Sequence, residues 1–110
     1  MIELVAVLRR KPGMSPEEFH RHWRETHGPL VVKALGRHFV GYEQHHRLVE
    51  EYGHDDQWDG VAVQRFESRA DFDAFLSDPA YAERVAPDEE SFLDRPAIVW
   101  FLTDVPVVLK

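Results

Sequence analysis

The chain has 110 residues, of which 44% are hydrophobic and 30% are charged, as expected for one folded domain rather than a disordered or fibrous segment. Thirteen basic and twenty acidic residues give 13 − 20 = −7 with the histidines neutral, which argues against a nucleic-acid partner. The lack of cysteine excludes disulfides, iron–sulfur clusters and thiolate catalysis, and no apolar stretch suits a signal peptide or a membrane span. We therefore expect a single domain over residues 1–110, located in the cytoplasm, with no membrane partner.

The first predicted element is a strand over residues 2–10. Hydrophobic side chains occupy both alternating sets of positions in this segment, so a strand here is apolar on both faces. We therefore expect other parts of the protein to cover it on both sides.

A helix is predicted to begin after Ser15. Ser15 suits the N-cap, Pro16 suits the first helical position, and Glu18 completes a capping box. Because Pro29 has no N–H to donate, Gly28-Pro29 predicts a kink or a restart, and the helix should continue to about Leu35. The core-facing side of this helix is predicted to carry Phe19, Trp23, Thr26 and Leu30.

The second strand is predicted over residues 38–49 and the third over residues 58–66, joined by an acidic loop at residues 50–57. One set of alternating positions in the second strand is unusually polar for an inward face. It carries Tyr42, Gln44 and His46.

Ser68 is predicted to cap a short second helix. Pro79 should start a further helix, and residues 80–94 should be helical in pieces because Pro87 interrupts them. Residues 97–102 form the last predicted strand, which is apolar on both faces and precedes an apolar tail. The buried side chains of the second helix are predicted to be Phe72, Phe75 and Leu76.

The order strand, helix, strand, strand, helix, strand is the split βαβ pattern of the ferredoxin-like α+β fold, with a four-stranded antiparallel sheet and both helices on one face. The other face of the sheet is then bare, although the first and last strands are apolar on both sides. We expect a second copy of the chain to cover it, which gives a homodimer packed sheet to sheet. The alternative is a monomer in which the tail from Val105 to Lys110 covers this face.

Seven histidines draw attention to the first helix. On an ideal helix His20 and His27 point within about 20° of each other, His27 faces the core, and His22 faces solvent. These spacings do not place two histidines at i and i+4, so no metal site is predicted. Taken alone, His27 fits a structural role as a part-buried imidazole that caps carbonyls near Gly28-Pro29.

The polar face of the second strand allows two interpretations. It faces solvent, or it lies under the first helix, opposite Trp23 and His27, and lines an apolar pocket. In the second case two imidazoles, a phenol and an amide surround one ligand, and such groups transfer protons near neutral pH.

Four stretches together resemble the EthD-domain family over nearly the whole chain. They are Leu4 to Ser15, Phe19 with Trp23, His27-Gly28-Pro29-Leu30, and Gly41-Tyr42 with Gln44 and His46. The family belongs to the dimeric α/β barrel proteins, so the resemblance implies two ferredoxin-like subunits packed sheet to sheet. It also implies that Trp23, His27 to Leu30, and the Tyr42, Gln44 and His46 face occupy recurrent family positions. The histidines that match no motif of this family are His20, His22, His38, His45 and His54.

The resemblance implies a group of activities, since similar barrels include cofactor-free monooxygenases, cyclases, decarboxylases, dehydratases and haem-binding members. The sequence has no dinucleotide or phosphate-loop fingerprint, and no pattern specifies haem, although His27 or His46 could serve as its axial ligand. We predict a cofactor-independent oxidoreductase, similar to a monooxygenase, that acts on a small hydrophobic or aromatic molecule. A lyase using the same pocket, or a non-catalytic carrier of a hydrophobic ligand or haem, stays open.

Each candidate residue has a predicted role. His46 is the predicted general base, and His27 orients the substrate or returns the proton. Tyr42 and Gln44 hydrogen-bond the developing oxyanion. If His27 and His46 share one apolar pocket, burial and mutual repulsion should lower at least one pKa below about 6.5. The predicted substrate-binding residues are Trp23, Gln44 and Leu30.

Overall fold

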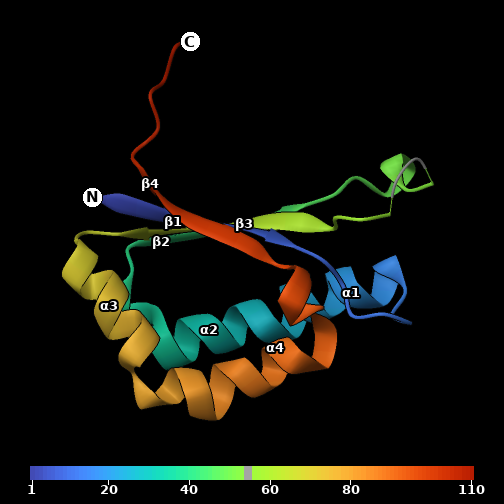
Figure 1. Ribbon diagram of the computed structural model, residues 1–110, viewed down its shortest axis with the longest axis horizontal. Coiled ribbons are helices and arrows are strands. Elements are labelled where there is room, and N and C mark those ends of the chain that lie inside the picture. Colours follow the sequence, from blue (N-terminus) through green and yellow to red (C-terminus); the bar gives the residue numbers. More distant parts are fainter. Residues whose placement is uncertain (54–55) are drawn as a thin grey trace.

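The computed structural model describes residues 1–53 and 56–110; His54 therefore lies outside the described residues. Within them, four antiparallel strands form one sheet in the order β2-β3-β1-β4, and the helices lie on one of its faces (Figure 1). The strands are β1 (Ile2–Leu8), β2 (Gly41–His46), β3 (Gly60–Phe66) and β4 (Val99–Asp104). The helices are α1 (Pro16–His22), α2 (Gly28–Leu35), α3 (Arg69–Ser77) and α4 (Ala86–Phe92). The predicted ferredoxin-like fold is confirmed.

Several predicted strands were too long or displaced. Short 3-10 turns at Gly36–His38 and Val49–Glu51 flank β2, so the segment predicted over residues 38–49 is a strand only from Gly41 to His46. Strand β3 begins at Gly60 rather than at residue 58. A further 3-10 turn at Arg95–Ala97, which contains a proline, shifts the start of β4 from residue 97 to Val99.

The start of α1 follows its predicted cap. The Ser15 Oγ accepts a hydrogen bond from the Glu18 N–H at 3.1 Å, and the Ser15 hydroxyl donates to Glu18 Oε1 at 3.0 Å. The Glu18 carboxylate thus meets the serine hydroxyl rather than the backbone N–H of an ideal capping box. Pro16 occupies the first turn, where a missing N–H costs nothing.

The predicted break at Gly28-Pro29 is a π-helical turn, and the helix continues through it from α1 to α2. Residues Trp23–His27 form this wider turn, and the Gly28 N–H donates to the carbonyl of Trp23. An α-helical turn would press the Pro29 ring against the carbonyl four residues earlier, so the extra residue per turn relieves that clash. The same solution recurs before Pro87, where Tyr81–Val85 forms a π-helical turn leading into α4.

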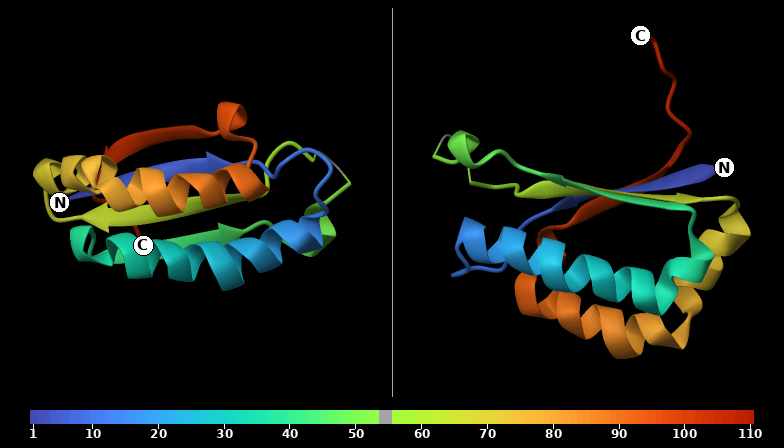
Figure 2. Two further views of the ribbon diagram at one scale, coloured as in Figure 1. Left: turned by 90° about the horizontal axis from the view of Figure 1, so that it is seen from below. Right: turned by 180° about the vertical axis from the view of Figure 1, so that it is seen from behind.

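Two helical rods, the first over residues 16–35 and the second over residues 81–92, run side by side on one face of the sheet (Figure 2). One set of alternating strand positions, which includes Leu4 and Leu8 of β1 and Phe66 of β3, packs on the helices. The buried side chains form two clusters, one around Phe66 and Phe75 and the other around Phe19 and Trp23. The site described below lies between these clusters.

The other set of strand positions forms an open sheet face that no described segment covers. Val99 and Phe101 are half exposed there, and the tail after β4 extends away from the body (Figure 1). Val107 and Leu109 of this tail are 83% and 92% exposed, so the tail does not cover the sheet of its own chain. The apolar residues of the open sheet face are Val5, Val7, Val61, Val63, Val99 and Phe101.

Candidate functional site

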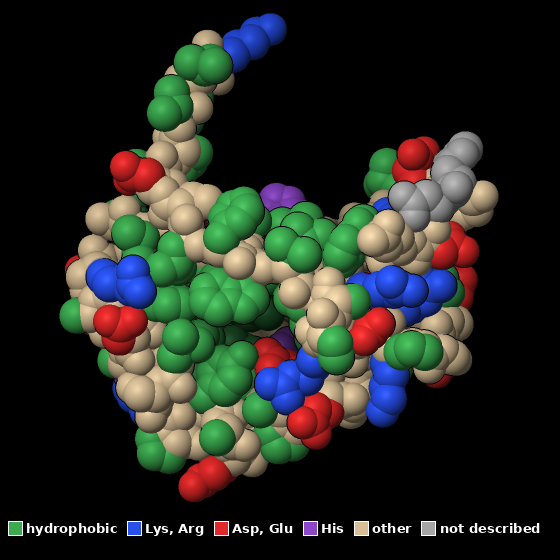
Figure 3. Space-filling view, in the orientation of Figure 1, with side chains coloured by type: hydrophobic (Ala, Val, Ile, Leu, Met, Phe, Trp, Pro, Cys, Tyr) green, Lys and Arg blue, Asp and Glu red, His purple; other side chains and the backbone are tan. Residues whose placement is uncertain are grey.

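A cavity of about 260 Å³ separates the two core clusters, between the sheet and the helices. Most of its wall is apolar and comes from β1, the first helical rod and the α3–α4 region, with Trp23, Phe72 and Trp100 as aromatic members. Figure 3 shows a hollow surrounded by hydrophobic side chains beside β4, with charged groups at its rim. Its volume lies just below the roughly 300–1,000 Å³ of pockets for drug-sized ligands, which suits a molecule of one or two rings.

A small set of polar side chains interrupts this apolar wall. Tyr42 and Gln64 enter it from the sheet, His27 from the π-helical turn, and Glu89 from α4. Arg95 lies at the start of the turn before β4 and also lines the cavity. An apolar cavity with a few polar groups on its wall is typical of a ligand-binding site.

His27 is held by a carboxylate of α4. Its Nδ1 lies 2.7 Å from Asp88 Oδ2, so the neutral ring carries its proton on Nδ1 and has an unprotonated Nε2. Burial lowers the pKa of His27 below its usual value, although the hydrogen bond and negative charge of Asp88 oppose this. A buried imidazole with a fixed tautomer is well suited to accept a proton.

His22 also contacts Asp88, which corrects its predicted exposure to solvent. Its Nε2 lies 3.0 Å from Asp88 Oδ1, and its ring packs 4.7 Å from the ring of Phe92. The helical rod of α4 lies against this side of the first rod and covers the position, which a single-helix projection could not show.

Glu89, the neighbour of Asp88, presents a carboxyl group to the same cavity. The Tyr81 hydroxyl donates to Glu89 Oε2 at 3.0 Å, and Arg95 Nε lies 3.9 Å from Oε1. Burial raises the pKa of Glu89 above its usual value, while the Tyr81 hydrogen bond and the Arg95 charge oppose the shift. Glu89 therefore holds its proton to a higher pH than an exposed glutamate does.

Gln64 contributes a donor that has no partner among the described residues. The side chain is 8% exposed, lies on the cavity wall, and its Nε2 is buried without a hydrogen bond. An unsatisfied buried donor costs free energy, and a ligand oxygen in the cavity would remove that cost. Tyr42, opposite Gln64 in the register of β2 and β3, is a second donor, and burial raises the pKa of its phenol.

The predicted site residues separate into two groups. Trp23, His27 and Tyr42 lie on the cavity wall as expected. Among the described residues that line the cavity, Gln44, His46 and Leu30 do not appear; Leu30 is half-buried elsewhere on the first rod. The polar face of β2 does lie under the first helix, because Gln44 Nε2 donates to the Trp23 carbonyl at 2.8 Å.

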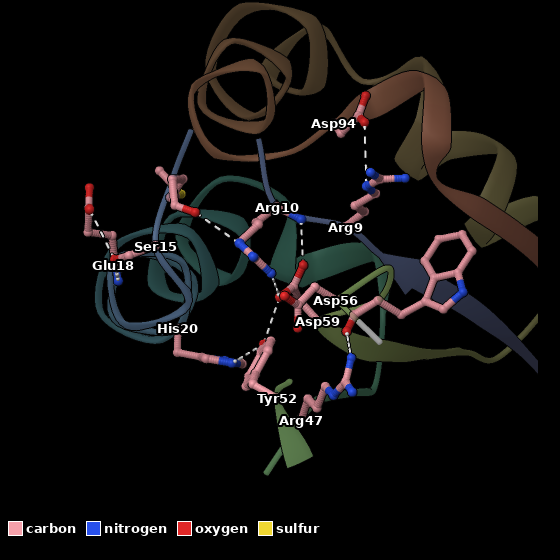
Figure 4. Close-up of polar contacts among 12 residues, drawn as sticks. Arg9, Arg10, Ser15, Glu18, His20, Arg47, Tyr52, Asp56, Asp59 and Asp94 are labelled. Carbon is pink, nitrogen blue, oxygen red and sulfur yellow. Dashed lines mark hydrogen bonds and ion pairs between the residues drawn. The ribbon is translucent and has the colours of Figure 1, made fainter. Parts of the chain in front are cut away.

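His46 belongs to a second polar assembly, which we call the histidine chain. It runs from the fully buried Asp59 to the amide of Gln44, and part of it is drawn in Figure 4. The Tyr52 hydroxyl donates to Asp59 Oδ1 at 2.6 Å and lies 2.9 Å from His20 Nε2. The Nδ1 atoms of His20 and His46 are 2.7 Å apart, and His46 Nε2 lies 2.9 Å from Gln44 Oε1. The histidine chain comprises Asp59, Tyr52, His20, His46 and Gln44.

The prediction that His46 shares a pocket with His27 is therefore corrected, because the partner of His46 is His20. Strand β2 runs back along the first rod, so its last residue, His46, lies next to the beginning of the rod. Four strand residues between Tyr42 and His46 span about 13 Å, and seven helical residues between His20 and His27 span about 10 Å. His20 and His27 thus point in similar directions on a helical projection but lie far apart along the helix axis.

Gly28 explains one position of the His27-Gly28-Pro29-Leu30 element. A Cβ on Gly28 would lie 2.7 Å from Gln44 Nε2 and 3.3 Å from the Trp23 carbonyl oxygen. The absence of a side chain therefore lets the amide of Gln44 reach the carbonyl that the π-helical turn exposes.

Sequence reasoning missed Asp88, Glu89, Gln64 and His20. The two carboxylates lie in an acidic stretch that resembles an ordinary solvated face. Gln64 was recognisable, because it is the polar member of the otherwise apolar set Gly60, Ala62, Gln64 and Phe66 in β3. Within residues 1–53 and 56–110, no group of three or more His, Asp or Glu side chains could hold a metal ion, and no helix could span a membrane.

Known proteins resemble this chain in sequence. The model of the EthD domain matches residues 11–96. A conidial pigment biosynthesis dehydratase EthD from Metarhizium robertsii is 30% identical over 97 residues, which are 77% of this chain and 68% of the relative. The dehydratase aurZ from Gibberella zeae is 24% identical over 106 residues, 86% of this chain and 70% of the relative.

Solved structures with the same fold have low sequence identity to this chain. An ethyl tert-butyl ether D family protein from Bacillus halodurans has a TM-score of 0.71 at 14% identity, covering 96% of this chain and 99% of its own. A dimeric ferredoxin-like protein from Bacteroides fragilis has a TM-score of 0.67 at 8% identity, with 94% of each chain covered. SnoaB, a cofactor-independent oxygenase from Streptomyces nogalater, has a TM-score of 0.65 at 17% identity and covers 98% and 95%.

Proposed function

The chain belongs to the EthD-domain family, and from this premise we propose that it is a small enzyme that eliminates water from a hydrophobic β-hydroxy ketone bound in the cavity. The observation that carries the proposal is that His27 and Glu89 both line the same cavity. His27 has an unprotonated nitrogen held in place by Asp88, and Glu89 retains its proton to a raised pH. Two groups of one cavity whose pKa values are shifted in opposite directions are typical of an acid and a base.

The proposed elimination uses each group once. His27 Nε2 removes a proton from the carbon next to the ketone, and the bonding pair moves to form the enolate. Gln64 and Tyr42 donate hydrogen bonds to the enolate oxygen, where the negative charge develops. The enolate re-forms the ketone as a carbon–carbon double bond replaces the C–O bond, and the hydroxyl leaves as water with the proton of Glu89. Solvent then returns a proton from His27 to Glu89, so no oxidant or reductant is consumed.

The names of both curated relatives, each a dehydratase, support elimination over oxidation. Our sequence prediction of a monooxygenase-like reaction begins with the same proton removal, after which oxygen would oxidise the carbanion. The two reactions therefore share the base and the oxyanion donors and differ in the fate of the carbanion. The carrier alternative uses the same cavity without turnover.

The roles predicted for the polar face of β2 are revised in this proposal. His27 replaces His46 as general base because it lines the cavity, and Trp23 keeps its place as an apolar wall. The reaction needs no cofactor. Haem ligation by His27 Nε2 would occupy the nitrogen that the base requires, so the two roles exclude each other.

We also propose that a second copy of the chain covers the open sheet face. The apolar valines of β1 and β3, the half-exposed Phe101 and the extended tail support this arrangement, as does the dimeric state of the Bacteroides fragilis protein. Sedimentation should show a species of about 2 × 12.9 kDa, and Phe101→Glu should convert it to 12.9 kDa. Val32→Glu alters an equally exposed apolar residue on α2 and should leave the dimer intact; a monomeric parent protein would contradict the proposal.

The 3-hydroxy derivative of α-tetralone provides a test of the reaction. It is a small bicyclic β-hydroxy ketone, and loss of water followed by tautomerisation gives fluorescent α-naphthol. Removal of either His27 or Glu89, as His27→Ala or Glu89→Gln, should lower the rate by about 10²-fold or more. Oxygen uptake instead of naphthol formation would indicate the monooxygenase, a Soret band would indicate haem, and binding with neither reaction would favour the carrier.

A further inference from the structure

The histidine chain has four contacts between polar atoms, and each needs one hydrogen to be a hydrogen bond. The contacts join Asp59 to Tyr52, Tyr52 to His20, His20 to His46, and His46 to Gln44, at 2.6, 2.9, 2.7 and 2.9 Å. Oxygen and nitrogen atoms this close repel each other when no hydrogen lies between them.

Both ends of the histidine chain accept rather than donate. The Asp59 carboxylate accepts hydrogen bonds from the Arg10 guanidinium at 2.7 Å and from the Arg10 backbone N–H at 2.8 Å. Tyr52 must therefore donate its hydrogen to Asp59. At the other end, Gln44 Nε2 donates to the Trp23 carbonyl, which fixes the amide with Oε1 towards His46. Only a hydrogen on His46 Nε2 can therefore complete the contact with Gln44.

Counting protons shows that this arrangement is one proton short when both imidazoles are neutral. Tyr52, His20 and His46 then supply three hydrogens for the four contacts. One further proton completes every hydrogen bond, with both Nε2 atoms protonated and a single hydrogen shared between the two Nδ1 atoms. A second added proton would place two N–H groups face to face at the 2.7 Å separation of these atoms, which they cannot accommodate.

We propose that the histidine chain takes up one proton as a unit and excludes a second, and that this proton locks the amide of Gln44 against the Trp23 carbonyl. His20 and His46 are thus positioning residues that act through Gln44. The protein uses the pair as a pH-dependent brace for the π-helical turn.

The charges around the pair set the pH at which the proton binds. Burial lowers the pKa of His20, and the positive charges of Arg24 and Arg10 lower it too, whereas Asp59 and Glu17 raise it. Burial, followed by His20 and Arg24, lowers the pKa of His46 to about 4. Burial therefore places the first proton uptake below the ordinary histidine pKa, and the positive charge of the first protonated ring opposes a second uptake. Arg47 also lies near the histidine chain, with its guanidinium carbon 4.8 Å from the Tyr52 ring centroid.

The brace acts on the cavity through the backbone. Gln44 holds the carbonyl of Trp23, which begins the π-helical turn, and His27 ends the same turn. Protonation of the histidine chain should therefore steady the position of His27. This catalytic consequence rests on the proposed function, whereas the proton count does not.

The test follows the ring nitrogens of His20 and His46 by NMR in ¹⁵N-labelled protein across the acid range. We expect one titration step common to both rings, and below it both Nε2 atoms protonated with the two Nδ1 atoms sharing one hydrogen. Independent steps in the two rings, or an unprotonated His46 Nε2 below the step, would overturn the proposal.

Variants at opposite ends of the histidine chain give a second test. Tyr52→Phe removes two contacts and one hydrogen, and Gln44→Leu removes one contact, so in each variant the neutral imidazoles already satisfy the remaining contacts. Each should lower the pKa of the common step by about one unit, a tenfold loss of proton affinity. An unchanged or raised step in both would contradict the proton count, and either variant serves if the other fails to fold. His45→Gln, on the opposite face of β2, is the control and should leave the step unchanged.

The link to the site is measured separately in the same titration. The His27 resonances should shift in parallel with the common step in the parent protein and lose that response in Gln44→Leu. A common step without this response would contradict the proposed effect of the histidine chain on His27, while leaving the proton count intact. Neither result depends on turnover, so failure of the proposed dehydration would be distinguishable from both.

Discussion

His27 Nδ1 lies 2.7 Å from Asp88 Oδ2, which ties the end of the first π-helical turn to α4. Asp88→Asn removes the negative charge that raises the pKa of His27, so this pKa should fall further below its usual value. NMR titration of the imidazole measures the shift. Asp73→Asn, which removes an exposed carboxylate of α3, is the matched control, and an equal titration of His27 in both variants would refute the assigned interaction.

The pH dependence of stability should carry opposite contributions from the histidines and Glu89. Because burial lowers the pKa values of His20, His27 and His46, the unfolded chain binds more protons below about pH 6.5, and the free energy of unfolding should decrease as the pH falls towards the lowered values. Glu89 has a raised pKa, so the folded state binds its proton first and partly offsets this loss. Glu89→Gln should make the decline steeper in urea unfolding at a series of pH values. A shallower decline would contradict the environment assigned to Glu89.

Substitution of two glycines at the ends of α2 should have opposite effects on stability. Gly28→Ala places a Cβ 2.7 Å from Gln44 Nε2 and should destabilise the protein by about 1–3 kcal/mol, because the held amide must move. A Cβ on Gly36 meets only Val32 Cγ1 at an ordinary 3.6 Å, so Gly36→Ala should be neutral or stabilising by up to about 1 kcal/mol. Chemical denaturation compares them, and equal effects would argue against the close approach of Gln44.

Replacing Gln64 should improve stability while weakening ligand binding. Gln64→Leu removes an unsatisfied buried donor and should stabilise the empty protein by about 1 kcal/mol. Gln44→Leu, the matched control, removes an amide with hydrogen-bond partners and should destabilise it. In calorimetry the parent protein should prefer α-tetralone, which has a ketone oxygen, over tetralin, which has none. If Gln64→Leu retains that preference, Gln64 does not bind the oxygen.

Much of the fold follows from local sequence signals. Short runs of strand-forming residues between turn signals indicated the strands, and Ser15 with Pro16 located the first helix, because these signals depend on neighbours only a few residues apart. Pro29 was recognised as a disturbance, but its outcome was not, since a π-helical turn depends on contacts such as the Gln44 amide that come from a distant strand.

The candidate site was predictable only in part for the same reason. Trp23, His27 and Tyr42 were found from their faces on one helix and one strand. The partnership of His27 with Asp88 depends on how two helical rods pack, and that of His46 with His20 depends on the direction in which β2 runs along the first rod. Neither relationship is encoded in the periodicity of a single element.

Deuterium exchange into α-tetralone tests the central claim most directly, because it isolates proton removal by His27 from the later fate of the carbanion. In D₂O, NMR should show that the protein accelerates exchange of the hydrogens next to the ketone, and that His27→Ala reduces this acceleration by about 10²-fold. The control is His45→Ala, which alters an exposed histidine on the open sheet face. This variant should accelerate the exchange as much as the parent protein does. Exchange at the buffer rate in the parent protein, or an equal acceleration by His27→Ala, would contradict the assignment of the cavity as an acid–base site.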